Sequence, residues 1–300
     1  MKKDTHIYYW YGIFALAYLL LTFLPSPNAH TLAKYHLSVI GLRLLDVTLV
    51  LPVLVMWFAI FYGYRQMSRY SQAIRDTRDG KPLMNLTRGL MVLALGVPLT
   101  SLLSNALKLL ARSHHSLDAL STILSQYLGV LYPLLAFIFI GTGSRGLSLI
   151  SKKRPSYAQA NLVALLVIIL GVVFCALIAH SHRDVRIAYH MSYSLVMLTL
   201  AIPYMYVWFL GLLAVVELHI YSKQVAGIVY RRSWRMLALG LGAVIVFDIL
   251  LQYLGTMSTW LGDLSLSGLL LVLYVLLLGL AASFIVVALG TKKLMKIEEA

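Results

Sequence analysis

The chain has 300 residues, of which 60% are hydrophobic and only 12% carry a charge. A soluble domain of ordinary composition is about 25% charged, so this composition excludes a soluble globular enzyme, a disordered chain and a small disulfide-stabilised domain. The single cysteine, Cys175, excludes a disulfide within the chain and a cysteine-based metal site. These counts indicate an integral membrane protein and leave its activity open.

Eight segments have the roughly 20 mainly apolar residues that a membrane-spanning helix needs. They cover residues 8–25, 38–62, 89–110, 120–141, 161–180, 191–216, 236–254 and 266–290. The first segment follows two lysines, as in a signal peptide, but its apolar run is too long and PSPNA is a poor cleavage site. We therefore expect an all-α, polytopic integral membrane protein with eight transmembrane helices, the first of them retained.

Basic residues distinguish the two sides of the membrane. With the N-terminus inside, most of the 25 Lys and Arg residues fall at cytoplasmic ends of spans. This is the positive-inside pattern, which predicts that both termini are cytoplasmic and favours the plasma (inner) membrane. The same pattern accounts for the basic excess without nucleic acid, which is not an expected partner.

The second and sixth spans share a pattern of polar and aromatic residues. Each contains Thr, Pro and Trp at the same spacing, as Thr48, Pro52 and Trp57 and as Thr199, Pro203 and Trp208. Proline cannot donate to the carbonyl four residues earlier, which here belongs to the threonine whose hydroxyl can help to satisfy it. We expect both helices to kink near their middles, and such paired kinks either line a cavity or are purely structural.

Further short matches follow in the same order along the chain, which suggests an internal duplication. Leu93–Gly96 matches Leu237–Gly240, and Val130–Tyr132 matches Val272–Tyr274. Because each copy holds four spans, both copies enter the membrane from the same side and the 4+4 repeat is parallel. We expect residues 1–157 to form the first four-helix unit and residues 158–300 the second, with a short cytoplasmic helical extension at its end.

Several polar and ionisable residues are expected at membrane depth in the outer half, where such groups usually face the protein interior or water. They are Arg43, Asp46, Asn105, Lys108, Asp248 and Gln252. Arg43 and Asp46 can neutralise each other on one helix, whereas Asp248 needs a partner from another helix, such as Lys108 or Arg43. The group either holds the helices together or lines an outward-facing pocket for a small solute or ion. We expect Glu217, near the inner end of its span, to reach the cytoplasmic surface.

Histidines gather on the predicted outer side. The six of interest are His36, His190, His114, His115, His180 and His182, and the repeat duplicates the first two. They can bind a transition metal, sense pH or simply be polar residues at helix ends. Haem would need histidines paired across helices; the sequence has no recognisable haem spacing, so haem is a minor alternative and the cofactor is otherwise unknown.

The sequence contains no phosphate-binding loop, nucleophile elbow or zinc-protease motif, so an enzyme is not expected. The leading hypothesis is a transport protein, a carrier or permease component, with its outward-facing polar pocket between the two repeats. Its partners would be the lipid bilayer and a small solute or ion. One alternative is a non-catalytic sensor or accessory subunit, which detects a ligand, metal or pH outside and contacts a protein through its cytoplasmic loops or C-terminal helix. A haem- or quinone-binding redox subunit and a membrane enzyme with a lipid-like substrate remain further alternatives.

Overall fold

The computed structural model describes residues 5–23, 39–113, 118–151, 155–181, 201–225, 227–257 and 266–298. Toward some helix ends only the backbone is described, including residues 39–48, 108–113, 118–126 and 178–181. The described residues form eight helices and no strand.

The helices are α1 (Thr5–Phe23), α3 (Val39–Ala73), α4 (Gly80–Ser113), α5 (Asp118–Ile150), α6 (Tyr157–Ser181), α9 (Ile202–Gln224), α10 (Ile228–Met257) and α11 (Leu266–Glu298). Seven of these contain a stretch long and apolar enough to cross a membrane, and α1 contains a shorter apolar stretch, Tyr11–Thr22. The prediction of an all-α protein of the multi-pass membrane type is therefore confirmed.

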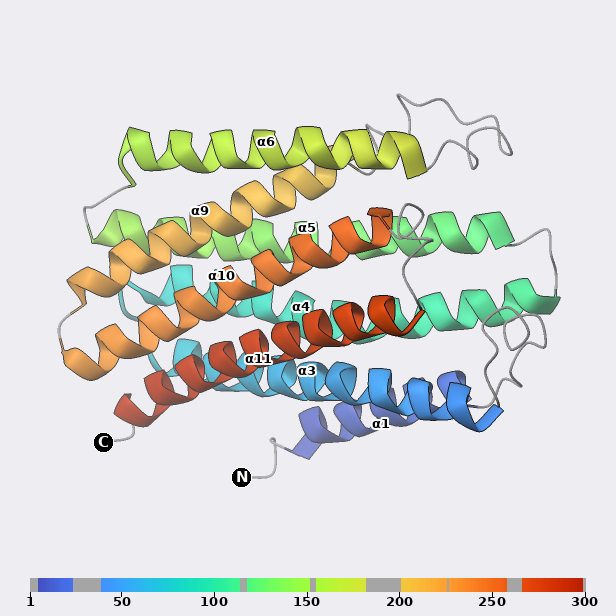
Figure 1. Ribbon diagram of the computed structural model, residues 1–300. Coiled ribbons are helices and arrows are strands. Elements are labelled where there is room, and N and C mark those ends of the chain that lie inside the picture. The colour runs from blue at the N-terminus through green and yellow to red at the C-terminus, as the bar shows by residue number, and fades with distance from the viewer. Residues whose placement is uncertain are drawn as a thin grey trace.

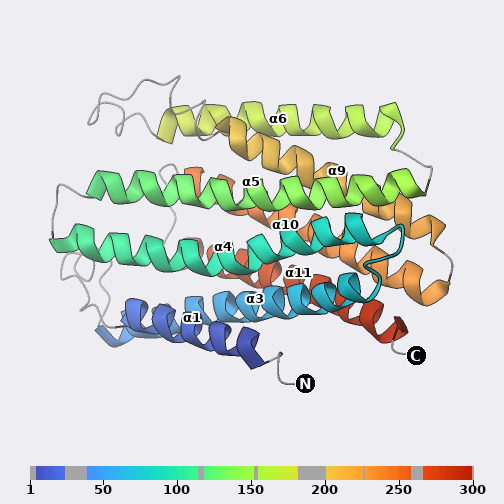
Figure 2. The same cartoon turned by 180° about the vertical axis from the view of Figure 1, so that it is seen from behind.

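The helices run lengthwise through one bundle, and the short links from α3 to α4 and from α9 to α10 lie at the same end as the C-terminus (Figures 1 and 2). We call this the basic end, because every Lys and Arg side chain in the described part lies in the half of its helix nearest to it or in the α3–α4 link. Several helices are longer than their predicted spans. For example, α3 continues for about three turns past residue 62, since the polar segment that follows still buries Met67 and Tyr70.

Each helix packs on specific neighbours. α4 packs on α5 and α3, α10 packs on α11 and α9, α1 contacts α3 and α4, and α6 contacts α9 and α10. Two further contacts, α3 with α11 and α5 with α9, join the first four helices to the last four. Trp57, Trp208 and Trp234 are fully buried in the resulting core.

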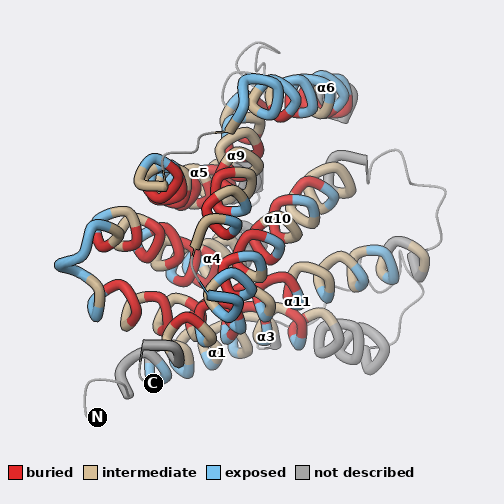
Figure 3. Tube along the Cα trace, turned by 90° about the vertical axis from the view of Figure 1, so that its left-hand side faces the viewer, coloured by how far each residue is buried: buried red, intermediate tan, exposed pale blue. Residues whose placement is uncertain are grey.

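The outside of the bundle is apolar. Figure 3 shows buried residues at the centre and α6 at the margin, with most of its residues at least partly exposed. Leu162 and Val172 on α6 are 66% and 63% exposed. Exposed large apolar side chains in such number suit lipid rather than water.

Small residues allow the helices to approach closely. A β-carbon added at Gly143 of α5 would lie 2.8 Å from the Leu86 nitrogen and the Pro82 carbonyl oxygen of α4. One added at Gly290 of α11 would lie 3.0 Å from the Leu237 nitrogen of α10. Backbone contact at glycine is a common basis of helix association in membranes, where burial of apolar side chains contributes little.

The substitution Gly143→Val should destabilise the bundle, because its side chain would force α4 and α5 apart. Overpacking of this kind costs about 1–3 kcal/mol, which should appear as a lower thermal midpoint in detergent. The control is Gly12→Val on α1, where a β-carbon would meet no heavy atom within 4 Å. Equal midpoints for the two variants would contradict the close α4–α5 contact.

Candidate functional site

A cavity of about 170 Å³ lies between α5 and α9, toward the basic end of the bundle. We call it the α5–α9 groove. Its lining consists of Ile138, Gly141, Thr142, Arg145, Tyr206, Leu210, Leu213, Ala214 and Glu217. Most of this lining is apolar. The side-chain polar contacts available to a bound group are Glu217, Arg145 and the hydroxyl groups of Thr142 and Tyr206.

Glu217 is the buried acid of the groove. Its side chain is only 4% exposed, and its Oε2 lies 2.6 Å from the hydroxyl oxygen of Ser144 on α5. The expectation that Glu217 reaches the cytoplasmic surface is therefore wrong. The side chain lies on the face of α9 that packs against α5, so the neighbouring helix covers it. Burying an ionised carboxylate is costly unless hydrogen bonds or a cation compensate it.

Ser144 can support either protonation state of Glu217. Its hydroxyl oxygen lies 2.6 Å from Glu217 and also 3.0 Å from the carbonyl oxygen of Gly141. With Glu217 ionised, the single hydroxyl proton is donated to the carboxylate. With Glu217 protonated, the acid can donate to Ser144 and Ser144 to the carbonyl. Arg145, exposed at the rim of the groove, supplies a cation near the ionised form. The arrangement can therefore bind and release a proton or a small cationic group.

The contact between α3 and α11 provides a comparison. There a β-carbon added at Gly63 would lie 3.4 Å from the Cα of Ala288, so the two helices touch closely. Three residues further along each helix, Gln66 and Thr291 are buried, 9% and 0% exposed, and Thr291 donates to the Ala288 carbonyl oxygen. The α3–α11 contact thus holds neutral polar groups where the α5–α9 groove holds a carboxylate.

Asp248, which the sequence predicts as a ligand-binding or coupling residue, lies where α10 meets α9 and α5. Gln252, one turn further along α10, hydrogen-bonds to its carboxylate, and Trp208 of α9 lies close by. Tyr132 of α5 and Tyr204 of α9 are also near enough to interact with it. The structure therefore brings together two of the six predicted pocket residues, Asp248 and Gln252, and adds aromatic neighbours that the sequence did not identify.

Of the other predicted pocket residues, only Asn105 has a described side chain. Asn105 lies on α4, which packs on α3, α5 and α1, whereas Asp248 lies on α10. The side chains of Arg43, Asp46, Thr48, Lys108 and His180 lie outside the described residues, as do Thr199, His36, His114, His115, His182 and His190. The expected partners of Asp248 and the predicted histidine sites therefore stay predictions.

The prolines of the two predicted kinks lie at different places in their helices. α3 continues as one helix through Pro52. Pro203 lies in the first turn of α9 as described, where proline's missing N–H removes no hydrogen bond within that helix. The structure also has Pro98 inside α4 and Pro133 inside α5, to which the sequence analysis gave no role.

Comparisons with protein-family models, with curated proteins and with solved structures found no match. Within the described ranges, no group of three or more His, Cys, Asp and Glu residues could hold a metal ion. The function of this site must therefore be inferred from its own geometry.

A double-mutant cycle should detect the bond between Ser144 and Glu217. Ser144→Ala deprives the buried carboxyl of its hydroxyl partner and should lower the free energy of unfolding by about 1–3 kcal/mol. In a Glu217→Gln background the same change should cost about 1 kcal/mol less, because a neutral amide forms the weaker bond. Unfolding in detergent measures both values.

Ser148→Ala is the matched control for this cycle. Ser148 is 1% exposed, and its hydroxyl donates to the Arg145 carbonyl of its own helix. Its cost should be the same in both backgrounds. A cost for Ser144→Ala that does not depend on residue 217 would show that the bond contributes no stability.

Proposed function

We propose that the protein is a transport protein, a carrier or permease component of the plasma (inner) membrane, built from two parallel four-helix halves. α1 and α3–α5 form one half, and α6 and α9–α11 form the other. The halves meet where α3 packs on α11 and where α5 packs on α9. A small solute or coupling ion binds in the α5–α9 groove, at Glu217.

The order of helix contacts supports the two-half arrangement. In the first half α1 contacts α3 and α4, α3 contacts α4, and α4 contacts α5. In the second half α6 contacts α9 and α10, α9 contacts α10, and α10 contacts α11. The two contacts between the halves are also equivalent by position, as expected for a pseudo-twofold axis along the membrane normal.

Close contacts between helices support the same alignment residue by residue. Gly143 approaches Pro82 and Leu86, and Gly290 approaches Ser233 and Leu237. Both α10 residues follow their α4 counterparts by 151 positions, the separation of Pro52 and Pro203, and the second glycine follows the first by 147. Aromatic packing agrees, since Tyr18 lies on Trp57 at 4.9 Å and 59° while Phe174 lies on Trp208 at 5.2 Å and 62°.

In one pair of equivalent contacts the glycine and the aromatic residue lie on opposite helices. Gly96 of α4 faces the ring of Tyr132 on α5, whereas Phe247 of α10 faces Gly279 of α11, at the same offsets of 151 and 147. This alignment differs from the sequence match of Leu93–Gly96 with Leu237–Gly240 by seven positions, or about two helical turns. Because the two alignments differ by whole helical turns, the short Leu-rich match still pairs residues on the same face of the helix.

The difference between the two inter-half contacts is the observation that carries the proposal. At the same offsets Glu217 corresponds to Gln66, Ser144 to Thr291 and Gly141 to Ala288. One contact is closely packed and neutral, whereas the other contains a cavity and a buried carboxylate. An ionisable group at membrane depth is costly to maintain and typically serves a substrate, ion or proton pathway.

A transport cycle follows from this geometry. The groove lies between the two halves, so a rocking motion of one half against the other would open or close it. Asp248, Tyr132 and Tyr204 lie further from the basic end along the same junction of α5, α9 and α10. Glu217 near one end and Asp248 toward the other would be successive polar contacts for a solute that crosses between the halves.

The proposed orientation, with the basic end in the cytoplasm, follows from the positive-inside rule. We expect Asp76→Cys, an exposed position in the α3–α4 link, to be inaccessible to a membrane-impermeant maleimide in intact cells. It should be labelled once the cells are permeabilised. The background variant Cys175→Ser removes the only native cysteine. Labelling in intact cells would contradict this orientation and place the basic end outside.

Transport itself can be tested with purified protein in liposomes. The probes are a panel of isotope-labelled amino acids, sugars, nucleosides and organic cations, with an internal pH-sensitive dye to follow protons. The wild-type protein should accumulate a member of the panel or move protons. Glu217→Gln should slow this movement about tenfold or more, the equivalent of one lost charged hydrogen bond.

The matched control is Asp76→Asn, the same carboxylate-to-amide change at an exposed residue outside the groove; it should transport at the wild-type rate. Unchanged transport in Glu217→Gln would contradict a role for the groove. If nothing moves, and a stoichiometric partner protein co-purifies but is lost on deletion of residues 292–300, the protein is an accessory subunit instead.

A further inference from the structure

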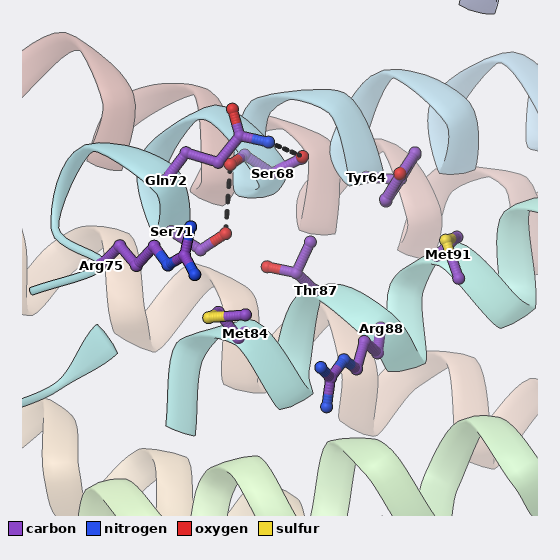
Figure 4. A pocket seen from close by; sticks show the side chains of 9 residues that line it. All are labelled: Tyr64, Ser68, Ser71, Gln72, Arg75, Met84, Thr87, Arg88 and Met91. Atoms are coloured by element: carbon purple, nitrogen blue, oxygen red, sulfur yellow. Dashed lines mark hydrogen bonds between the residues drawn. The ribbon is translucent and has the colours of Figure 1, made fainter. Parts of the chain in front are cut away.

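A second cavity, of about 300 Å³, lies between α3 and α4 at the basic end (Figure 4). We call it the α3–α4 groove. Its nine lining residues are Tyr64, Ser68, Ser71, Gln72, Arg75, Met84, Thr87, Arg88 and Met91. A cavity of this size is at the small end of ligand pockets, so it has room for a compact polar group rather than a whole lipid.

The charge of this groove is positive. Arg75, from the α3–α4 link, and Arg88, from α4, both line it, and none of the nine lining residues is acidic. Of the carboxylates in the link, Asp79 accepts a hydrogen bond from Tyr221 of α9 at 3.0 Å, and Asp76 is exposed and outside the lining. The backbone N–H of Arg75 donates to the Gln72 carbonyl at 3.3 Å, but among the described residues its guanidinium makes no ion pair or hydrogen bond, so the five side-chain N–H donors are available to a ligand.

Hydroxyl and amide groups surround the cationic positions. In Figure 4 the guanidinium group of Arg75 lies beside Ser71, and Gln72 reaches Ser68. Ser68 accepts this weak 3.5 Å bond from Gln72, which leaves its own proton for another acceptor. The Tyr64 hydroxyl, at the far side of the groove, has no protein partner among the described residues. Arg88 donates one N–H to the Asn85 side-chain oxygen at 3.2 Å and keeps its other donors. The groove therefore presents several donors and two guanidinium groups, a combination that suits phosphate oxygens.

We propose that the α3–α4 groove binds a phosphate group, and that this phosphate is the headgroup of an anionic phospholipid in the leaflet at the basic end. The location favours a lipid, because basic pockets between membrane helices at the cytoplasmic side meet lipid headgroups directly. Met84 and Met91 add apolar contacts for the first carbons of the lipid backbone. Binding at this groove can be tested without a transport assay, since the groove lies between α3 and α4 and shares no lining residue with the α5–α9 groove.

Native mass spectrometry of the full-length protein in detergent tests the proposal with two lipids of identical acyl chains, phosphatidylglycerol and phosphatidylcholine. The wild-type protein should retain phosphatidylglycerol preferentially. Arg75→Gln combined with Arg88→Gln should bind it at least about tenfold more weakly, because each lost charged hydrogen bond accounts for about that factor. Equal thermal midpoints in phosphatidylcholine would show that the variant is folded.

The matched control removes two positive charges from the same end of the bundle. Lys223→Gln combined with Arg235→Gln changes exposed residues that line neither cavity, and its phosphatidylglycerol affinity should stay within about twofold of the wild type. Equal losses in the two double variants would overturn the proposal, because surface charge alone would then explain binding. Inorganic phosphate is the last probe. The lipid assignment fails if phosphate stabilises only proteins with Arg75 and Arg88 intact while phosphatidylglycerol binds no better than phosphatidylcholine. The groove then binds free phosphate.

Discussion

Close helix packing at small residues is the constraint on which this bundle depends. In a bilayer the outward face of a helix is already in an apolar medium, so helices gain little by burying apolar side chains against each other. Contacts such as Gly143 with α4, Gly290 with α10 and Gly63 with α11 instead bring backbones together. Where two helices pack less closely, a cavity remains between them. At Gly141 the nearest atom of α9 to an added β-carbon is the end of the Leu210 side chain, at 3.9 Å, and there the α5–α9 groove opens.

The loosened contact is also where the polar groups are found. A carboxylate buried among apolar helices must be compensated locally, and Ser144 is the described residue that bonds to Glu217. The α3–α11 contact is tighter, and in the proposed alignment of the halves Gln66 and Thr291 take the places of Glu217 and Ser144. The buried carboxylate thus lies in the more open of the two contacts between the first four and the last four helices, and the proposal that a ligand or proton binds there rests on this difference.

Sequence reasoning succeeded where a single physical rule decides the outcome. Lipid demands helices with internally satisfied backbones, so all eight apolar segments appear as helices, and the basic residues sort to one end of the described bundle. The predictions were wrong or incomplete where the burial of a side chain depends on which helix packs beside it. Nothing near Glu217 in the sequence shows that α5 covers it, and Ser144 is one small residue among many. The proposed alignment of the halves also rests on packing: the contact of Gly96 with Tyr132 and that of Phe247 with Gly279 each pair a glycine with an aromatic ring, in opposite order.

A hydrogen bond from Tyr221 connects α9, which lines one groove, to the α3–α4 link, which contributes Arg75 to the other. Tyr221 lies one turn after Glu217 on α9, and its hydroxyl donates to Asp79 in the link that also carries Arg75. The bond joins the two proposed halves and occupies Asp79, the less exposed of the two carboxylates in the link. If a transport cycle moved α9 away from this link, Asp79 would lose its partner and compete for the guanidinium of Arg75. An anion in the α3–α4 groove would therefore favour the arrangement with the bond intact, and its binding energy would bias the position of α9 through differential affinity for the two states.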